Sequence, residues 1–343
     1  GLDYTPRVVT GLATAEAVLA LEGENVWIVE NAGASNTEPN LGSTATGRVN
    51  LGENRTLLAS GSAAREAFEA AIEEWKLITA SMLFGLAQRG LEMAAEYSRE
   101  RTAFGRPIGS FQGIAHRLAD AITETEGAQL LNWRTASALS RGEPHAAALV
   151  SMAFWWSSQA ASMAMAGALH TYGGYGMSME YEIQLYYRRA KAWALPAGDP
   201  QRELNRIAER LWLAEKSRTA LPDAGCCDLD FSLGDKAETF ASEVNDYFEQ
   251  NLTPELRAQA HHSTEGYSRQ FSQKLATDNL LFPHWPVEYG GQERDAFDMA
   301  AMTAVLESLN WEHVTAPITN QVAQALMHFA SKEVKDEVLT RFA

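Results

Sequence analysis

Between two long helical patterns lies the stretch Tyr97-Ser98-Arg99-Glu100-Arg101-Thr102-Ala103-Phe104-Gly105-Arg106-Pro107-Ile108-Gly109-Ser110-Phe111-Gln112. Apolar residues recur at helical spacing on both sides of it, at Phe84, Leu86, Leu91 and Ala94 before it and at Ile114, Leu118 and Ile122 after it. Gly105, Pro107 and Gly109 interrupt the helical pattern between them. The stretch therefore predicts a turn between two helices, and this turn presents a guanidinium group, an aromatic ring and an amide together.

Arg101 by itself has an ordinary interpretation, as a solvated or helix-capping residue beside a glycine turn. Its neighbours make the pattern more specific, because the full run is Arg101-x-x-Phe104-Gly105-x-x-Ile108-x-x-Phe111-Gln112. This run resembles the signature of the C-terminal helical domain of acyl-CoA dehydrogenases. The resemblance implies that Arg101 contacts the pyrophosphate of FAD, and that Phe104 and Gln112 line its adenosine half. A guanidinium group suits this role, since its planar fork matches phosphate oxygens in pairs and stays charged.

The composition allows more than one buried core. The chain has 343 residues, of which 46% are hydrophobic, and a domain takes roughly 100–200 residues. The formal net charge of -16 argues against a nucleic-acid or anionic-membrane surface, because either partner requires a basic field. An anionic substrate such as an acyl-CoA thioester must then find a local basic pocket.

No run of about 18 apolar residues predicts a membrane span, and no basic-then-apolar leader predicts export. Cys226 and Cys227 are adjacent, and neighbours in sequence rarely form a relaxed disulfide. We therefore expect a reducing, cytoplasmic setting. Because the first residue is Gly1 and not methionine, we also expect the chain to begin inside a longer gene product.

Residues 1–60 alternate and turn like β structure. The short apolar runs are Arg7-Val8-Val9, Val18-Leu19-Ala20-Leu21, Val26-Trp27-Ile28-Val29 and Gly47-Arg48-Val49-Asn50-Leu51. Gly23-Glu24-Asn25 suits a hairpin turn between two of them. On their own these strands are too few to close a barrel. The resemblance implies that they form the second half of the middle β-domain of an acyl-CoA dehydrogenase.

Residues 61–218 are expected to form the C-terminal helical bundle domain, which is a four-helix bundle in the family resembled. The helical pattern predicts one helix from Ala63 to Glu100, with an interruption near its start as an open alternative. A second helix follows Phe111 and ends near Arg141-Gly142-Glu143-Pro144, and a third runs from His145 to Tyr172. The third helix is apolar around nearly its whole circumference, as expected of the central helix of a bundle.

The third helix ends in a glycine turn, His170-Thr171-Tyr172-Gly173-Gly174-Tyr175-Gly176. Glycines let the backbone take positive φ and approach a ligand closely, although a helix C-cap explains the same pattern. The resemblance implies that Gly173, Gly174 and Gly176 pack against the adenosine-pyrophosphate region of FAD, often from the partner subunit. His170 lies where many family members carry glutamine, and we place it in the cofactor region without a role in proton transfer.

The family resembled removes the α-proton of a thioester with a glutamate, which must lie within hydrogen-bond reach of that proton. Most members carry this base in a loop that resembles Leu195-Pro196-Ala197-Gly198-Asp199-Pro200-Gln201, and aligning the glycine places Ala197 at the glutamate position. Other branches place the base on the first helix of this domain, where counting back from Phe104 gives Trp75. Neither residue accepts a proton, so we expect this copy to lack its own base. The remaining candidates for the base are Glu74 and Asp199. In a helix, the side chain of Glu74 points about 100° away from that of Trp75, and the side chain of Asp199 is short.

Residues 219–232 are interpreted as a linker and residues 233–343 as the truncated N-terminal helical domain of a second copy. The sequence predicts two helices there, Asp235–Gln250 and Gly266–Asp278. The turn Pro286-x-Glu288-Tyr289-Gly290-Gly291 resembles the same domain of acyl-CoA dehydrogenases. His261-His262 has no convincing metal partners nearby and is expected in a solvated loop, so no metal site is predicted. The end of one copy joined to the beginning of another resembles the middle segment of a tandem actinobacterial acyl-CoA dehydrogenase, in which one copy can lack the base.

The expected fold is mostly α: a partial β-barrel segment, a C-terminal four-helix-bundle domain, and then the N-terminal helical domain of a second copy. The resemblance covers nearly the whole chain and implies part of an FAD-dependent enzyme that oxidises an acyl-CoA thioester to the α,β-enoyl-CoA, on a sterol or fatty side chain. It also implies an electron-transfer flavoprotein or similar acceptor, and assembly with the other copy or subunit of the same protein. One rival interpretation is a catalytically silent scaffold module without flavin. Another keeps this copy active, with Asp199 or Glu74 as its base.

Overall fold

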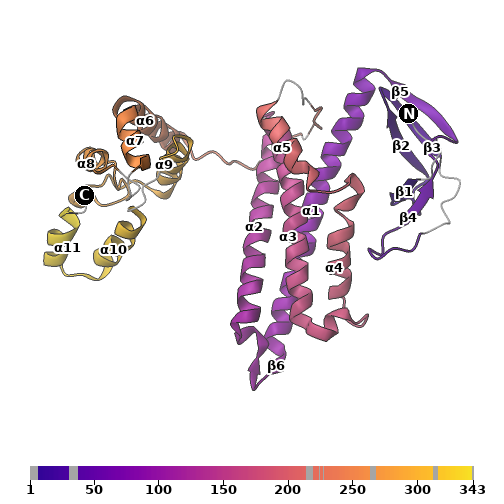
Figure 1. Cartoon of the computed structure of the whole chain (residues 1–343), viewed down its shortest axis with the longest axis horizontal. Helices are drawn as coiled ribbons and strands as arrows, with labels where there is room; N and C mark the ends of the chain where they lie inside the picture. The colour runs from indigo at the N-terminus through magenta and orange to yellow at the C-terminus, as the bar shows by residue number, and fades with distance from the viewer. Residues whose placement is uncertain are drawn as a thin grey trace. The chain divides into compact units, whose positions relative to one another are not determined.

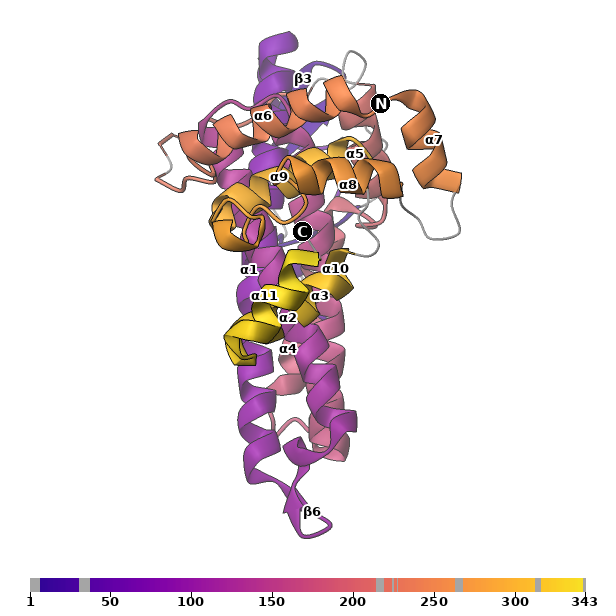
Figure 2. The same cartoon turned by 90° about the vertical axis from the view of Figure 1, so that its left-hand side faces the viewer.

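The computed structural model describes residues 7–30, 38–213, 219–223, 225–226, 228–262, 268–311 and 316–341. The chain divides into two compact units, Gly1–Asp230 and Phe231–Ala343, and each is described by itself. The first unit combines a small region of β-sheet with a long helical bundle, whereas the second consists of shorter helices (Figures 1 and 2). The prediction of a mostly helical fold with a small β region at its start is confirmed.

Two small antiparallel sheets begin the first unit. One has the order β2 (Ala17–Glu22), β3 (Asn25–Glu30) and β5 (Arg55–Ser60), and the other pairs β1 (Arg7–Thr10) with β4 (Thr46–Val49). The predicted hairpin turn joins β2 to β3, and Gly23 takes a φ of +64° there. The sheets bury a small core made by Leu12, Ala20, Val29 and Val49. Strand β5 is absent from the predicted strands because most of its side chains are exposed, so no alternation marks it.

Three long helices run side by side through the bundle (Figures 1 and 2). They are α1 (Ser62–Glu100), α2 (Gln112–Ser140) and α3 (Ala146–Tyr172), and the shorter helices α4 (Ile183–Ala192) and α5 (Arg202–Trp212) both pack on α3. The three predicted long helices are therefore confirmed, and α1 runs without the interruption that the sequence left open.

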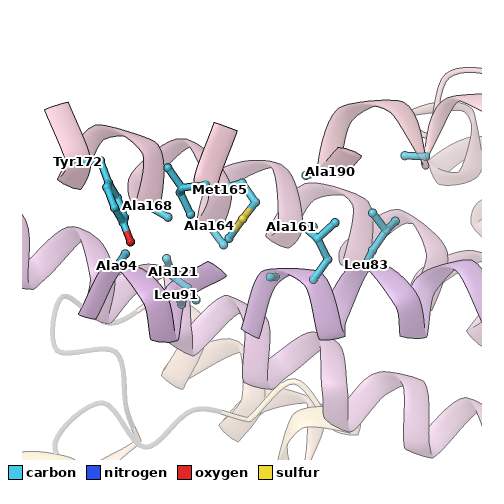
Figure 3. Close-up of a cluster of buried hydrophobic side chains, with 14 residues drawn as sticks. Leu83, Leu91, Ala94, Ala121, Ala161, Ala164, Met165, Ala168, Tyr172 and Ala190 are labelled. Carbon is cyan, nitrogen blue, oxygen red and sulfur yellow. The ribbon is translucent and has the colours of Figure 1, made fainter. Parts of the chain in front are cut away.

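Small residues on α3 bring the long helices close together. Ala161, Ala164 and Ala168 are fully buried in the main core (Figure 3). Met165 lies over Gly90 of α1, where a Cβ atom would come within 2.3 Å of the Met165 methyl carbon. Glycine at position 90 therefore leaves room for the Met165 side chain in the closely packed interface between α1 and α3. The positions of their ends, where the candidate site lies, follow from this packing.

A loop of the sheet region docks on α4. Gly42 permits this close approach, because a Cβ atom there would lie 2.3 Å from the Cβ atom of Ala192. The Arg188 guanidinium donates from Nη1 to the Leu41 carbonyl at 3.2 Å and to Ser43 Oγ at 2.7 Å. Helix α4 therefore ties the sheet region to the bundle.

The second unit contains α6 (Asp235–Asn251), α7 (Pro254–His262), α8 (Arg269–Thr277), α9 (Ala296–Ser308), α10 (Ala316–Phe329) and α11 (Lys332–Val338). One of its cores packs the rings of Phe248, Phe271 and Trp311 edge to face, with centroids 5.0 Å apart for the latter two. The prediction that His261-His262 lies in a loop is wrong, because these residues end α7.

The Pro-x-Glu-Tyr-Gly-Gly turn of the second unit has a structural reason for both of its glycines. Gly290 takes a φ of +84°, which favours glycine. A Cβ atom on Gly291 would lie 1.9 Å from the carbonyl oxygen of Trp285, whose ring is fully buried and stacks on Phe282 at 4.3 Å. This turn therefore serves the core of its own unit.

Candidate functional site

The turn between α1 and α2 forms a short hairpin at one end of the bundle. Strand β6 (Thr102–Ala103) pairs with β7 (Arg106–Pro107), and the hairpin projects beyond the ends of α1 and α2 (Figures 1 and 2). Phe104 and Gly105 form its tip with φ values of +52° and +81°, as in the two-residue turns that suit hairpins. The Phe104 side chain is 96% exposed and meets the Phe111 ring edge-on at 6.1 Å. The hairpin tip therefore presents an exposed aromatic ring at the end of the bundle.

Arg101 joins α1 to this hairpin. Its backbone N–H donates to the Tyr97 carbonyl at 2.9 Å, and its own carbonyl accepts the Ile108 N–H at 2.8 Å. Its guanidinium carbon lies 5.6 Å from the centroid of the Tyr175 ring. The residue is exposed, and within the described ranges it forms no ion pair with a carboxylate. Its charge is therefore available to an anion.

The predicted glycine turn forms the short 3-10 helix η2 (Gly173–Met177) directly after α3. Gly173 takes a φ of +59°. A Cβ atom on Gly176 would lie 2.6 Å from the Leu169 carbonyl oxygen, whereas one on Gly174 would meet no atom within 4 Å. The local structure thus requires glycine at positions 173 and 176. At position 174 no nearby atom excludes a side chain, so the absence of one leaves open space beside the turn.

Four tyrosines connect the hairpin to the glycine turn, and we call them the tyrosine cluster. Tyr97 of α1 stacks on Tyr172 of α3 with ring centroids 4.1 Å apart, and Tyr181 meets these rings edge-on at 6.4 and 5.6 Å. Tyr175 of the glycine turn packs on Tyr181 at 5.5 Å. Burial raises the pKa of the Tyr97 and Tyr172 hydroxyls, so both stay neutral at physiological pH. The cluster brings Arg101 and the glycine turn together.

The other residues predicted to face the cofactor lie at the same end of the bundle. Gln112 is the first residue of α2, and His170 lies in the last turn of α3, where its carbonyl accepts the Gly173 N–H. Both residues are exposed, as is Phe104 at the hairpin tip. The seven predicted cofactor residues therefore lie where α1 meets the hairpin, at the hairpin tip, at the start of α2, and at the end of α3 with the η2 turn that follows it. Among these segments, Arg101 and the glycine turn are joined by the Tyr175 ring contact.

The two positions where the family carries its base hold no carboxylate. Ala197 ends the short 3-10 helix η3 (Leu195–Ala197), before Gly198 with a φ of +95°. Trp75 is half-buried on α1, and its ring lies 5.7 Å from that of Phe154 on α3. The side chain at this second position therefore packs on the neighbouring helix.

The two remaining carboxylate candidates have ordinary structural explanations. Asp199 is exposed, and its Oδ1 accepts the Gln201 N–H at 3.0 Å just before α5 begins. Such a bond is typical of an aspartate in a turn. Glu74 is exposed on α1, as expected of a solvated helix residue. The surroundings of both carboxylates are therefore explained without a catalytic role.

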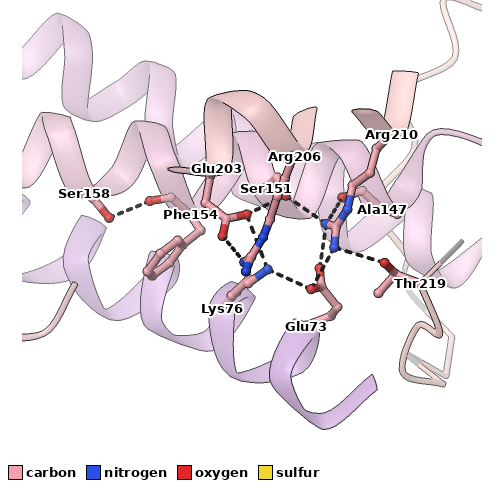
Figure 4. Close-up of polar contacts among 10 residues, drawn as sticks. All are labelled: Glu73, Lys76, Ala147, Ser151, Phe154, Ser158, Glu203, Arg206, Arg210 and Thr219. Atoms are coloured by element: carbon pink, nitrogen blue, oxygen red, sulfur yellow. Dashed lines mark hydrogen bonds and ion pairs between the residues drawn. The ribbon is translucent and has the colours of Figure 1, made fainter. Parts of the chain in front are cut away.

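A network of buried charges on α1 and α5, joined by a serine of α3, lies close to the second base position (Figure 4). Lys76 Nζ lies 2.7 Å from Glu73 Oε1 and 3.3 Å from Glu203 Oε2, and these three side chains are at most 4% exposed. Arg210 donates to both Glu73 oxygens at 2.8 and 2.9 Å, and Ser151 Oγ donates to Glu203 at 2.6 Å. We call these five residues the buried ionic network.

The buried ionic network keeps the Glu73 carboxyl in its ionised form. Burial alone would raise the pKa of this carboxyl, but the hydrogen bonds and charges of Arg210 and Lys76 outweigh it and leave the pKa lowered. A carboxylate with a lowered pKa and both oxygens bound is a poor proton acceptor. Sequence reasoning missed the network, although Glu73 and Lys76 at a spacing of three residues carried a weak signal, because such pairs usually lie on a solvated helix face.

Among the residues that the structure describes, no group of three or more His, Cys, Asp or Glu side chains could hold a metal ion. None of the helices described is both long enough and apolar enough to cross a membrane.

The sequence matches two models of one family. Residues 66–212 match the acyl-CoA dehydrogenase C-terminal domain, and residues 234–343 match the acyl-CoA dehydrogenase N-terminal domain. Acyl-CoA dehydrogenase FadE27 of Mycobacterium tuberculosis is 32% identical over 189 residues, which make up 51% of this chain and 51% of that protein. The chain thus spans about half the length of this relative.

Solved structures share the fold. The ChsE4-ChsE5 complex from Mycobacterium tuberculosis has a TM-score of 0.53 and 26% identity, over 61% of this chain and 59% of that chain. A variant of the steroid ACAD Tcur3481-Tcur3483 has a TM-score of 0.55 and 23% identity, over 62% of this chain and 60% of that chain. The two matched domains, of which the C-terminal domain comes first in this chain, place the chain in the acyl-CoA dehydrogenase family of flavoprotein oxidoreductases.

Proposed function

We propose that the chain is the middle segment of a tandem acyl-CoA dehydrogenase, in which the end of one copy is joined to the beginning of a second. The order of the matched domains supports this proposal, and so do relatives from mycobacteria, which are actinobacteria. Residues 1–60 then belong to the middle β-domain of the first copy and residues 61–218 to its helical bundle domain. Residues 219–232 are the linker, and residues 233–343 begin the second copy.

The proposed reaction of the full-length protein is the oxidation of an acyl-CoA thioester to the α,β-enoyl-CoA. Bound FAD would supply the acceptor for the β-hydride. In this proposal the acyl group is a sterol or fatty side chain. The electrons would pass on to an electron-transfer flavoprotein or a similar acceptor. A cytoplasmic setting, which the free, exposed thiol of Cys226 supports, belongs to the same proposal.

The residues at the end of the bundle fit a cofactor that carries a diphosphate. Arg101 offers an exposed guanidinium group, and charge-assisted pairs of N–H donors are the usual ligands of phosphate oxygens. Gly174 leaves open space where a side chain would otherwise stand. We propose that Arg101 holds the pyrophosphate, and that Phe104 and Gln112 hold the adenosine half. His170, Gly173, Gly174 and Gly176 would line the same region.

One observation carries this assignment: Arg101 and the glycine turn, which are far apart in sequence, meet at the Tyr175 ring. The resemblance to acyl-CoA dehydrogenases assigns both segments to the same cofactor. The exposed ring of Phe104 at the projecting tip favours a cofactor shared with the other copy or subunit. The arm would then remain useful to its neighbour even where this copy has lost its base.

We propose that this copy has no base of its own. Ala197 and Trp75 occupy the two family positions, and Glu73 is held by two cations in the buried ionic network. Removal of the α-proton would then be the task of the other copy. An Asp199→Asn variant that keeps full turnover would remove Asp199 as the alternative, and Glu74→Gln would do the same for Glu74.

The experiment that tests the proposal is Arg101→Ala in the full-length protein, with flavin content measured after gel filtration. The rival scaffold without flavin predicts no flavin at all, whereas we expect bound FAD that the variant loses. A hydrogen bond to a charged group contributes about 1.5–3 kcal/mol, which corresponds to roughly a 10–150-fold weaker affinity. Arg99→Ala is the matched control, since Arg99 is also exposed in the last turn of α1. Equal flavin retention in both variants would contradict the assignment.

A further inference from the structure

The Tyr175 ring lies where it can hold the Arg101 side chain by its face. The guanidinium carbon of Arg101 is 5.6 Å from the ring centroid. A cation within about 6 Å of an aromatic centroid is attracted by the negative face of the ring. The Tyr175 side chain is 46% exposed, so the ring lies partly at the surface, as a ligand-facing pair requires.

The Tyr175 ring is itself held in place by the rest of the tyrosine cluster. It packs on Tyr181, and Tyr181 packs on the stacked pair of Tyr97 and Tyr172. The Tyr172 hydroxyl donates to the Met93 carbonyl of α1 at 3.2 Å, which anchors the stack to that helix. Because the Tyr97 carbonyl also accepts the Arg101 N–H, the cluster fixes both the backbone and the side chain of this arginine.

An aromatic ring face leaves the N–H donors and the charge of a guanidinium group free, whereas a carboxylate partner does not. A guanidinium group has five N–H donors, and a carboxylate partner uses some of them and cancels the charge. Arg210 of the buried ionic network is in that state, since Glu73 accepts two of its hydrogen bonds. Arg101 instead meets a ring, and no carboxylate among the described residues pairs with it. Its donors and its full charge remain available.

We propose that Tyr175 is the positioning residue of Arg101, and that it orients the guanidinium toward a diphosphate without using the donors that bind it. This inference rests on the proposed cofactor role of Arg101. Tyr175 acts through the arginine, so its effect on cofactor binding must vanish when the arginine is absent. Its effect must also survive loss of the tyrosine hydroxyl, because the ring face carries the attraction.

The test measures the rate of FAD release from the full-length protein in a double-mutant cycle. Tyr175→Leu keeps an apolar side chain of moderate size but removes the ring, and we expect it to release FAD roughly 2–5-fold faster. Tyr175→Phe should release FAD at the rate of the unmodified protein, and Tyr175→Leu should have no further effect in an Arg101→Ala background. Tyr187→Leu is the matched control, because Tyr187 also has a cation near its ring, Lys191 at 5.7 Å, and lies on α4. It should leave FAD release unchanged.

Two results would overturn the inference. Tyr175→Leu with unaltered FAD release would show that the ring does not position Arg101, and an equal loss in the Arg101→Ala background would show that it acts by another route. A second readout is independent of FAD: in proton–nitrogen NMR spectra, the ring should shift the Arg101 Nε–H resonance upfield in the unmodified protein and in Tyr175→Phe, but not in Tyr175→Leu. If Arg101→Ala leaves FAD bound, the proposed function fails, and this spectrum still decides the role of Tyr175.

Discussion

Replacing Lys76 by methionine tests the buried ionic network. Methionine nearly matches the length of the side chain but removes the ammonium group, which lies 2.7 Å from Glu73 and 3.3 Å from Glu203. Removing one partner of a buried ion pair costs about 3–5 kcal/mol, because the other charge stays buried. Arg210 still binds Glu73 and Ser151 still binds Glu203 in this variant, so we expect a loss of about 3 kcal/mol. In a unit of this size, that loss lowers Tm by roughly 6–12 °C.

The assay is differential scanning calorimetry of the whole chain, because two compact units can unfold in separate transitions. The transition that contains the bundle should move, and the other should not. Arg65→Met is the matched control on the same helix, since it breaks an exposed ion pair with Glu69 at 2.8 Å. Exposed pairs contribute little to stability, so we expect little or no shift in Tm. If the bundle transition has the same Tm in Lys76→Met as in Arg65→Met, the proposed contribution of the network to stability is wrong.

Further predictions concern the pKa of Glu73 and the geometry of the glycine turn. Glu73 binds its proton more weakly in the folded chain than in the unfolded one, so the stability it contributes is complete above its ordinary pKa of 4.5 and is lost as the pH falls through its lowered pKa. Melting curves from about pH 6 to about pH 3 should therefore fall less steeply for Glu73→Gln than for the unmodified chain; parallel curves would contradict the lowered pKa. Gly176→Ala forces a Cβ atom to 2.6 Å from the Leu169 carbonyl and should destabilise the bundle by about 1–3 kcal/mol. Gly174→Ala has open space and should keep its Tm while it weakens FAD retention, so equal melting of the two alanine variants would count against the turn geometry.

The long helices could be predicted from the sequence because glycine and proline mark where each of them ends. The turn at Phe104 and Gly105 and the turn at Gly23 both follow from such local signals, although the sequence did not predict that the first of them is a β-hairpin. Strand β5 and helix α7 could not be predicted in the same way. The exposed side chains of β5 give no alternation, and α7 is a short polar segment that resembles a loop.

The individual segments of the candidate site could be predicted from the sequence, but the contacts between them could not. Arg101 and the glycine turn carry motifs, whereas the ring contact between Arg101 and Tyr175 depends on how α1 and α3 pack. The buried ionic network escaped prediction for a related reason. Glu73 and Lys76 have the spacing of a solvated ion pair, and only the approach of Glu203 from α5 makes their position a buried one.

A visible absorption spectrum of the purified full-length protein, recorded before and after acyl-CoA substrates are added without oxygen, tests whether the protein is a flavin-dependent dehydrogenase. We expect a flavin band that bleaches when a substrate is added, since the proposed reaction transfers a hydride to the cofactor. Arg101→Ala should reduce this band, and Arg99→Ala should not. A colourless protein would contradict the proposal and favour the scaffold without flavin.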